Sequence, residues 1–483
     1  MMATTRSRAP EFPAGFVWFN VDSPVSLTEQ LGRVVLLNFC AFSSVACRQL
    51  LADLDYIGNR YRRDLVILGI HSPRYPGEAG VVHLRQSINK YRVTYPMAHD
   101  AELKLWHAYG IKNRPTQVLI DRDGYIVGSL SGGGKRERLD QVIRYQCGKR
   151  SRIPPRVVRP SPARQAPATT GPLCFPGRLL VSGSKLFIAD SGNNRILVVS
   201  RSGVVLRQYG SESEGLFDGK GESAAFNNPQ GMVLVDDFLY VADSGNHAIR
   251  RINVRTDDVD TIAGNGRVGI AAPRVPVTPA ACSLNSPLDL SMKDGALYIA
   301  MAGAHQIWRL SLVANRIEVF SGNGVAGLVD GPSGRAAFAQ PSGLVIVGQQ
   351  LFVVDADAGA IRTVDLVTGA VTTLVGSSLF GFGNRDGTGK AALLQYPQDI
   401  TADPRRRMLW VADAYNNKIR RVGLDTRYIS SPVVDRGLNE PGGLAFEDDS
   451  LYIANTNAHE ILCINPDDGH ATTLNVREET VEV

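Results

Sequence analysis

The chain has 483 residues, 44% of them hydrophobic, which is longer than a single hydrophobic core and predicts two or three domains. It contains no run of about 18 consecutive apolar residues and its first residues are polar, so we expect a cytoplasmic protein with no membrane partner. The formal net charge of +5 divides into +6 for residues 1–146, +6 for residues 147–172 and −7 for residues 173–483, and this acidic third part argues against a nucleic-acid partner.

Strands and helices are predicted to alternate in residues 1–147. The expected strands lie at residues 34–42, 65–73, 95–100, 115–121 and 125–130, and the expected helices at residues 45–63, 81–91, 102–109 and 136–146. A hairpin turn is indicated at Asp121–Gly124. This order predicts an α/β domain of the thioredoxin-like class.

Two local features sharpen that prediction. Pro115, within Arg114-Pro115-Thr116, stands just before a strand, where the cis-proline loop faces the redox site in this fold. The strand-to-helix turn from Cys40 to Arg48 occupies the place of the redox motif. The sequence therefore predicts a candidate site made from this turn and the Pro115 loop.

The next segment, residues 148–172, combines six prolines with six basic residues. Proline fixes φ and removes a backbone donor, so we expect an extended linker between two domains. A solvated tether accounts for this composition, and a basic docking arm for an acidic partner is the alternative.

Residues 173–483 repeat one pattern six times. Each copy has an apolar strand, a short polar turn and a second strand, as in LFIADSGNNRI at residues 186–196 and LYIANTNAHEI at residues 451–461. The aligned strand-end residues are Asp190, Asp243, Met301, Asp355, Asp413 and Asn455. Each copy follows a second marker that contains a proline, such as NPQGMVLV. Six four-stranded units of this kind predict a six-bladed all-β propeller, because a single blade cannot bury both of its faces.

Several longer stretches carry a resemblance that covers both predicted domains. They are GIHSPRYP (69–76), YPMAHDAELKLWHAYGI (95–111), VADSGNHAIR (241–250), MAGAHQIW (301–308) and FAQPSGL (338–344). On these residues the chain resembles the NHL repeat-containing protein 2 family, in which a thioredoxin-like domain precedes an NHL-type propeller. The resemblance implies the same two domains in the same order.

The sequence departs from that family at the strand-to-helix turn. The resemblance implies Cys-Cys-x-x-Cys there, and this chain has Ser43-Ser44-Val45-Ala46-Cys47. A dithiol cycle needs one ionised thiol, which forms a mixed disulfide with the substrate, and a second thiol, which attacks that disulfide. Ser44 stands at the position of the lost nucleophile, and an alcohol is not ionised at neutral pH. The Trp-Pro-Thr of relatives is also replaced, since Arg114 precedes Pro115.

Cys47 is therefore the candidate catalytic residue, with three interpretations. It forms a rearranged redox pair with Cys40, it acts as a single thiol, or it is a structural remnant. The predicted function is a binding or scaffold protein that engages a protein or peptide through a propeller face. The alternative is a thiol–disulfide or peroxide-related oxidoreductase acting through Cys47, with Cys40 or an external thiol as its partner.

Other motifs are assigned structural roles, and no metal or cofactor is predicted. His247, His305 and His459 share one repeat position with Asn194 and Asn417, which indicates a turn hydrogen bond rather than a metal-binding ring of imidazoles. The strand-end aspartates receive the same interpretation. The Asp-Gly loops at residues 218–226, 330–338 and 386–394 offer about one carboxylate each near the turn, too few for calcium. Six cysteines are too few for a disulfide scaffold in so long a chain.

Overall fold

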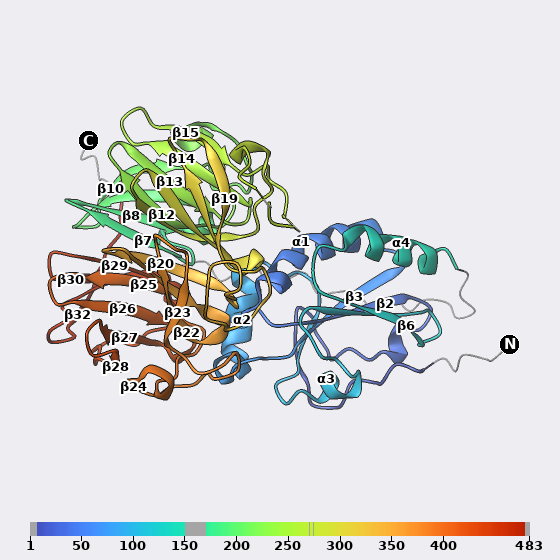
Figure 1. Cartoon of the computed structure of the whole chain (residues 1–483). Coiled ribbons are helices and arrows are strands. Elements are labelled where there is room, and N and C mark those ends of the chain that lie inside the picture. The colour runs from blue at the N-terminus through green and yellow to red at the C-terminus, as the bar shows by residue number, and fades with distance from the viewer. Residues whose placement is uncertain (1–6, 150–170, 270, 274, 479–483) are drawn as a thin grey trace. The chain divides into compact units, whose positions relative to one another are not determined.

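The structure, a computed structural model, describes residues 7–149, 171–269, 271–273 and 275–478. The chain divides into two compact units, Met1–Ala168 and Thr169–Val483, coloured from blue to red along the chain in Figure 1. Most of the predicted linker, residues 150–170, lies outside the described residues. Its limits, and those of the domains at 1–147 and 173–483, therefore stay predictions.

The first unit contains a six-stranded mixed sheet in the order β1-β4-β3-β2-β5-β6. Its strands are β1 (Val17–Phe19), β2 (Val34–Cys40), β3 (Leu65–His71), β4 (Met97–His99), β5 (Thr116–Ile120) and β6 (Ile126–Ser131). Its α-helices are α1 (Val45–Arg60), α2 (Val81–Lys90), α3 (Lys104–Ala108) and α4 (Arg136–Cys147). Two short 3₁₀ helices, η1 (Thr28–Gln30) and η2 (Pro76–Ala79), complete it.

Strand β2 is buried along its whole length, which explains its nearly continuous apolar sequence. Leu36 packs in a cluster with side chains of α1, α2 and α4, whereas Leu37 packs with α3 on the opposite face of the sheet. Helices thus cover both faces, and the predicted thioredoxin-like class is confirmed.

Two details of this unit differ from the sequence prediction. Strand β1 was not predicted, and it pairs antiparallel with β4 at the sheet edge. Helix α1 ends at Arg60 rather than at residue 63. The chain turns there because the Asp64 carbonyl must accept the Val34 backbone N–H as β3 begins beside β2. Helix propensity alone does not reveal that long-range requirement.

The second unit consists of six antiparallel sheets, and the predicted six-bladed propeller is confirmed. Blade 1 holds β7 (Leu179–Ser182), β8 (Lys185–Asp190), β9 (Arg195–Ser200) and β10 (Val205–Tyr209). Blade 2 holds β11 (Gly219–Lys220), β12 (Pro229–Val235), β13 (Phe238–Asp243), β14 (Ala248–Asn253) and β15 (Asp258–Ala263). Blade 3 holds β16 (Pro287–Lys293), β17 (Ala296–Met301), β18 (Gln306–Ser311) and β19 (Arg316–Ser321).

The remaining blades follow the same plan. Blade 4 holds β20 (Pro341–Val347), β21 (Gln350–Asp355), β22 (Ala360–Asp365) and β23 (Val371–Val375). Blade 5 holds β24 (Gly387–Thr388), β25 (Asp399–Asp403), β26 (Met408–Asp413), β27 (Lys418–Gly423) and β28 (Tyr428–Ser430). Blade 6 holds β29 (Pro441–Glu447), β30 (Ser450–Asn455), β31 (Glu460–Ile464) and β32 (Ala471–Leu474). The short 3₁₀ helices of the propeller are η3 (Ser191–Asn193), η4 (Gly221–Ser223), η5 (Pro279–Ala281), η6 (Ala302–Ala304), η7 (Ala356–Ala358), η8 (Gly389–Ala391), η9 (Ala414–Asn416) and η10 (Thr456–Ala458).

The innermost strands of neighbouring blades, β7, β12, β16, β20, β25 and β29, contact one another around the propeller axis, and several of their labels gather there in Figure 1. Each blade is formed by consecutive strands, so the ring closes without exchanging a strand. Residues after β32 bond to blade 1: the backbone N–H of Val205 donates to the Arg477 carbonyl at 2.8 Å, and that of Arg477 donates to the Gly203 carbonyl at 2.9 Å.

The antiparallel order gives the propeller two different ends. The loops between blades and the turns between the second and third strands lie at one end, which we call the loop face. Within the described part of the chain it includes residues 210–218, 224–228, 264–269, 282–286, 322–330, 335–340, 376–386, 391–398 and 431–440. The middle parts of the longer inter-blade segments instead pair with the outermost strands, as Gly219–Lys220 do with β15. The other two turns of each blade lie at the opposite end. No helix within the described part of the chain is long and apolar enough to cross a membrane.

Candidate functional site

The first candidate site is the turn between β2 and α1, residues 41–44, which we call the β2–α1 turn. Ser44 is the N-cap of α1, with extended backbone angles, and its hydroxyl accepts the backbone N–H of Cys47 at 3.4 Å. Serine is among the residues preferred at this position, because its side chain satisfies an N–H that the helix leaves unpaired. The residue at the place of the lost nucleophile therefore stabilises the helix start.

The two neighbouring cysteines are shielded from solvent. Cys40 and Cys47 are each 1% exposed, belong to one core cluster and carry free thiols. Burial raises the pKa of the Cys47 thiol to about 11. Burial also raises the pKa of Cys40 well above its ordinary value, and a charge on Cys47 would raise it further. Because the thiolate is the reactive form, neither cysteine has the environment of an active nucleophile.

A buried carboxylate that the sequence analysis missed ties the β2–α1 turn to its neighbours. Glu78, on η2, is fully buried and accepts the backbone N–H of Ser43 at 2.9 Å. It also accepts the backbone N–H groups of Arg74 at 2.8 Å and of Tyr75 at 3.4 Å. A glutamate three residues into a helical turn reaches back to the first N–H in this manner, and that spacing was the available signal.

Arg114 anchors the Pro115 loop to neighbouring parts of the domain. The Arg114–Pro115 peptide bond is cis. The Arg114 guanidinium lies 3.9 Å from the centroid of the Trp106 ring and donates to the carbonyls of Ser72, at 2.6 Å, and Pro73, at 3.0 Å. Burial lowers the pKa of Arg114, and the Glu78 charge counteracts part of this effect. Arg114 thus supplies packing and backbone bonds to the Pro115 loop.

Arg48 also bonds to the β2–α1 turn. Its guanidinium donates to the carbonyls of Phe42, at 2.7 Å, and Ser43, at 3.2 Å, and lies 5.7 Å from the centroid of the Tyr91 ring. The β2–α1 turn is therefore bonded through both its N–H and C=O groups to charged side chains. This geometry suits a turn of fixed shape, whereas a dithiol centre needs a thiol that solvent and substrate can reach.

A histidine pair lies beside Cys40 in the sheet. His71 pairs with Cys40 in the strand register, and its Nδ1 lies 3.2 Å from Nδ1 of His99. Nε2 of His99 lies 2.9 Å from the Ala79 carbonyl, so that nitrogen carries the proton. Burial first, and the His99 charge second, lower the pKa of His71 well below its ordinary value. His71 is therefore neutral at physiological pH, and the pair joins β3 and β4 to η2.

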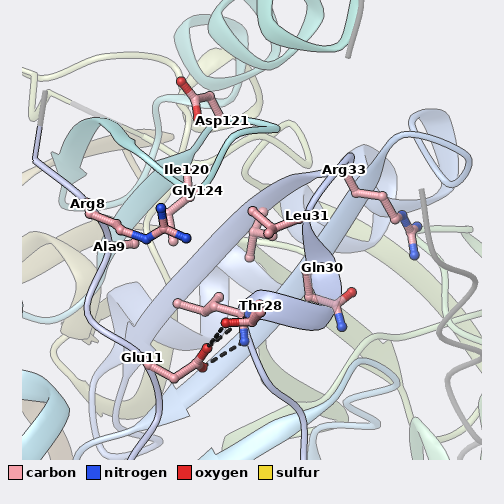
Figure 2. Close-up of a pocket in the computed structure, with 12 residues that line it drawn as sticks. Arg8, Ala9, Glu11, Thr28, Gln30, Leu31, Arg33, Ile120, Asp121 and Gly124 are labelled. Carbon is pink, nitrogen blue, oxygen red and sulfur yellow. Dashed lines mark hydrogen bonds between the residues drawn. The ribbon is translucent and has the colours of Figure 1, made fainter. Parts of the chain in front are cut away.

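A small cavity of about 60 Å³ lies at the other end of β2, between the N-terminal segment and η1. Figure 2 shows Glu11 directed at Thr28, whose backbone N–H and hydroxyl donate to it at 3.0 and 2.9 Å. The same carboxylate accepts the Leu27 N–H at 2.7 Å. Its oxygens are occupied by protein donors, and the space holds only a few water molecules. We assign this cavity a structural role.

In the propeller, the repeated strand-end side chain joins distant parts of each blade. In blade 4 the Asp355 carboxylate accepts the backbone N–H of Ala339 at 2.9 Å. Equivalent bonds run to Asp190, Asp243, Asp413 and Asn455 from Cys174, Asn227, Gln395 and Asn439, and to the sulfur of Met301 from Asn285. The predicted turn bond exists as well, because Asn246 donates to Asp243 at 2.7 Å. These contacts therefore support a structural role for the strand-end side chains.

Three buried arginines fasten the loop face to the blades. Arg362, fully buried, donates to Asp355 at 3.2 Å and to Asp330 at 2.9 Å. It also donates to the carbonyls of Val329 and Ala337, both at 2.9 Å. Arg250 makes the corresponding contacts in blade 2. In blade 5, Arg420 donates to Asp413 and Asp386 and to the side chains of Asn384 and Ser431. Each guanidinium is paired and hydrogen-bonded, as a buried charge must be, and it fixes the loop that precedes its blade.

These contacts also decide the role of the Asp-Gly loops. Asp218, Asp330 and Asp386 each accept a bond from a buried arginine and from a hydroxyl group of Thr261, Thr373 or Ser431. The arginine occupies the position of a cation, which supports a structural role over calcium. Within the described ranges no group of three or more His, Cys, Asp or Glu side chains is arranged to hold a metal ion.

The shared histidine and asparagine position links neighbouring blades. The imidazole Nδ1 of His247 accepts the Ser286 N–H at 3.0 Å, and that of His459 accepts the Phe175 N–H at 3.0 Å. Asn194 and Asn417 accept the N–H groups of Asn228 and Glu440, at 2.8 and 2.7 Å. The predicted structural role is retained, but the partner was wrong: the bond crosses to the next blade rather than closing the local turn. The His459 bond joins blade 6 to blade 1 and helps to close the ring.

Exposed apolar side chains concentrate on the loop face. In the part of the propeller that the structure describes, Phe217 is 65% exposed and Phe380 is 73% exposed, and both lie on inter-blade loops. The same face carries exposed Val268, Val325, Val329 and Val433. At the opposite end the exposed large apolar side chains of the described residues include Val313 and Val367. Apolar side chains gathered on one face of a protein mark an interaction surface.

Comparison with known proteins covers both units. The family model described as AhpC/TSA family matches residues 6–129, and the model described as NHL repeat matches residues 226–252. NHL repeat-containing protein 2 of Gallus gallus is 33% identical over 507 residues, which is 94% of this chain and 69% of that protein. The Homo sapiens protein of the same name is 33% identical over 510 residues, with the same two coverages. Protein SUPPRESSOR OF QUENCHING 1, chloroplastic, of Arabidopsis thaliana is 33% identical over 511 residues, 97% of this chain and 48% of that protein.

Proposed function

This chain belongs to the NHL repeat-containing protein 2 family, and from that premise we propose that it is a binding or scaffold protein that docks a protein or peptide on the loop face. The single observation that carries the proposal is the gathering of exposed apolar side chains on loops that buried arginines hold in place. Loops fixed before binding lose little conformational freedom when a partner docks, so less binding free energy is spent on ordering them.

In this proposal the thioredoxin-like domain is a rigid module without redox turnover. Three charged side chains, Arg48, Glu78 and Arg114, hold the β2–α1 turn and the Pro115 loop. Cys47 is buried and its thiol has a raised pKa. These features support a structural role for Cys47 over single-thiol chemistry.

The competing function is thiol–disulfide or peroxide-related chemistry through Cys47, with Cys40 or an external thiol. One observation favours it: the two thiols lie in the same core cluster beside the β2–α1 turn. It requires an opening of the domain that exposes them, because both are 1% exposed. Turnover assays of the wild type and of Cys47→Ser separate the two functions.

The docking proposal is tested with two variants of the full chain. The first carries Phe217→Asp, Val329→Asp and Phe380→Asp on the loop face. The control carries Val313→Asp and Val367→Asp at the opposite end, where the side chains are 91% and 78% exposed. Proteins cross-linked to the wild type in cell extract are quantified by mass spectrometry, and the strongest is then purified and titrated against all three forms.

The loop-face variant should bind the purified partner at least about tenfold more weakly, since lost hot-spot contacts cost about 1 kcal/mol or more each, on the order of several-fold in affinity. The control should bind as the wild type does. Equal affinity of all three forms, or an equal loss in the control, would overturn the proposed face. Circular dichroism and thermal unfolding of each form show that the folds are comparable.

The cytoplasm remains the proposed location, because six free thiols persist in a reducing compartment. We propose no cofactor and no nucleic-acid partner. The acidic balance of residues 173–483 supports the second statement, since a surface that binds phosphates carries an excess of Lys and Arg.

A further inference from the structure

One register position of the propeller repeat carries three charged residues and three glycines. It is the second residue after the marker proline in each blade, on or next to the innermost strand. In order from blade 1 to blade 6, it is occupied by Arg178, Gly231, Asp289, Gly343, Asp399 and Gly443. Because the innermost strands contact one another around the axis, these six residues form a ring at the centre of the propeller.

Arg178 reaches across this ring from blade 1. Its side chain is 4% exposed, and its Nη1 lies 2.5 Å from the Asp399 carboxylate of blade 5. The guanidinium also donates to three backbone carbonyls: Gln398 at 2.6 Å, Ser342 at 3.0 Å and Gly442 at 3.1 Å. One side chain thus bonds blade 1 to blades 4, 5 and 6.

The two carboxylates each bond their own blade to the next one. Asp289 of blade 3 accepts the Leu344 N–H of blade 4 at 2.7 Å. Asp399 of blade 5 accepts the Leu444 N–H of blade 6 at 2.7 Å. Both carboxylates are buried. Together the three charged side chains, which belong to blades 1, 3 and 5, donate to or accept from backbone groups of blades 4, 5 and 6.

The glycines are required by the charged residues. A Cβ on Gly231 would overlap Oδ1 and Cα of Asp289, and one on Gly343 would lie 2.8 Å from Cα of Asp399. A Cβ on Gly443 would lie 2.8 Å from Cα of Arg178. Each glycine therefore makes room for the charged residue of the following blade. The alternation is a built feature of the axis rather than an incidental cluster.

The charges of this ring do not balance when all three groups are ionised. One guanidinium faces two carboxylates, and the other three positions are glycine. An unmatched charge in a buried site is costly, so the site favours binding one proton. Burial raises the pKa of Asp289 to about 7; Arg178 lowers it and Asp399 raises it, and these are the charged groups that face Asp289.

We propose that Arg178, Asp289 and Asp399 form a proton-sensitive clasp at the propeller axis, which is strongest when Asp289 holds a proton while Arg178 pairs with Asp399. Loss of that proton leaves one uncompensated negative charge among blades 1, 3 and 5. The bonds that the clasp makes between the blades then weaken. The clasp is independent of the loop face and of the thiols.

The sign of the pH dependence follows from linkage. The folded state keeps a proton on the clasp up to about pH 7, whereas an unfolded aspartate loses its proton near a pH of about 3.9. The folded state binds more protons in that interval, so the clasp's contribution to stability falls as pH rises through about 7 and then becomes constant. Between pH 6.5 and 8.5 the expected change in the unfolding constant is about fourfold.

Hydrogen–deuterium exchange of the full chain, followed by mass spectrometry of peptides from β16 and β20, measures this change after correction for intrinsic exchange rates. Protection of the wild type should fall about fourfold between pH 6.5 and 8.5. The Asp289→Asn variant should lose most of this dependence. Asp399→Asn is the second test, because it leaves Arg178 and Asp289 as a matched pair and should also flatten the profile.

The matched control is Asp243→Asn. Asp243 is equally buried but has its own partner in Arg250, and burial raises its pKa to about 6, below the pH window of the test. This variant should reduce protection at all pH values and retain the wild-type pH dependence. The proposal is overturned if Asp289→Asn and Asp399→Asn keep the wild-type dependence, or if Asp243→Asn flattens it equally.

Discussion

Charged side chains hold both the β2–α1 turn and the loop face of the propeller in place, but the two regions present different groups to solvent. In both regions charged side chains bond to backbone groups and fix a loop, through Arg48 and the buried Glu78 in the first and through the buried Arg250 and Arg362 in the second. The first loop is fixed over buried thiols, whereas the second is fixed with apolar side chains in solvent. A rigid loop is thus no sign of catalysis by itself; what matters is which groups it exposes.

The largest expected effect comes from replacing Ser44 of the β2–α1 turn with cysteine. Ser44→Cys recreates a Cys-x-x-Cys motif, with Cys47 as its second member, at the start of α1, where the helix N-terminus lowers a thiol pKa. We expect this variant to form a disulfide with Cys47 under mild oxidation, detected by a mass decrease of two hydrogens and by peptide mapping. The wild type should remain a set of six free thiols under the same conditions.

Ser43→Cys is the control for this experiment, because residue 43 precedes the helix cap and does not restore the spacing to Cys47. Ser43 is also buried at 1% exposure. If Ser44→Cys stays reduced while its fold is intact, the turn does not have the dithiol geometry that we infer from it.

The next effect tests the loop face. Arg362→Met removes a buried guanidinium and leaves the Asp355 carboxylate buried without its partner. Breaking a buried ion pair costs about 3–5 kcal/mol, so we expect a loss of that size in the free energy of unfolding. Limited proteolysis should also cut residues 329–337 faster, because their carbonyl bonds to Arg362 are gone.

Arg255→Met is the matched control. Arg255 pairs with Asp237 at 3.2 Å, but its side chain is 74% exposed. Exposed pairs contribute about 0–1 kcal/mol, so this variant should unfold nearly as the wild type does. Equal losses in the two variants would contradict the fastening role given to Arg362.

A smaller effect concerns the reactivity of Cys47. With a pKa of about 11, its thiolate fraction at pH 8 is on the order of one in a thousand, against roughly one in four for an ordinary cysteine with a pKa near 8.5. Alkylation of Cys47 in the folded chain should therefore be at least about 100-fold slower than in denaturant. It should also accelerate steadily from pH 7 to 10. A plateau near pH 8 would show an unburied thiol.

The smallest effect concerns the serine that remains in the turn. Ser44→Ala removes the N-cap acceptor of α1 and should lower the free energy of unfolding by about 1 kcal/mol, the usual value of a cap. Ser44→Asn, which retains a capping side chain, should restore most of this loss. Chemical denaturation of the thioredoxin-like domain, followed through Trp18 and Trp106, measures both.

The sequence carries enough local information for the fold but not for the contacts that fix the site. Repeated strands and turn residues predicted six blades, because each blade is built from adjacent segments. The bond from Ser43 to Glu78 and the contacts of Arg114 escaped prediction, because these partners belong to other elements. The His459 bond to Phe175 spans 284 residues, so its direction was also beyond a local argument.

The axial clasp shows the same limit in another form. The alternation of charged residues and glycine after the marker proline was present in the six aligned copies. Only the ring arrangement of the innermost strands reveals that Arg178 of blade 1 meets Asp399 of blade 5. The pattern becomes interpretable when the copies are compared with one another around the axis rather than along the sequence.

The most direct test of the central claim is turnover of the full chain in insulin-reduction and peroxide-consumption assays, with mass-spectrometric mapping of its thiols before and after. Wild type and Cys47→Ser are compared at equal concentration. A scaffold whose thioredoxin-like domain is redox-silent predicts background rates in both forms and six unmodified thiols in the wild type. Turnover in the wild type that disappears in Cys47→Ser would contradict it and assign the protein to the oxidoreductases.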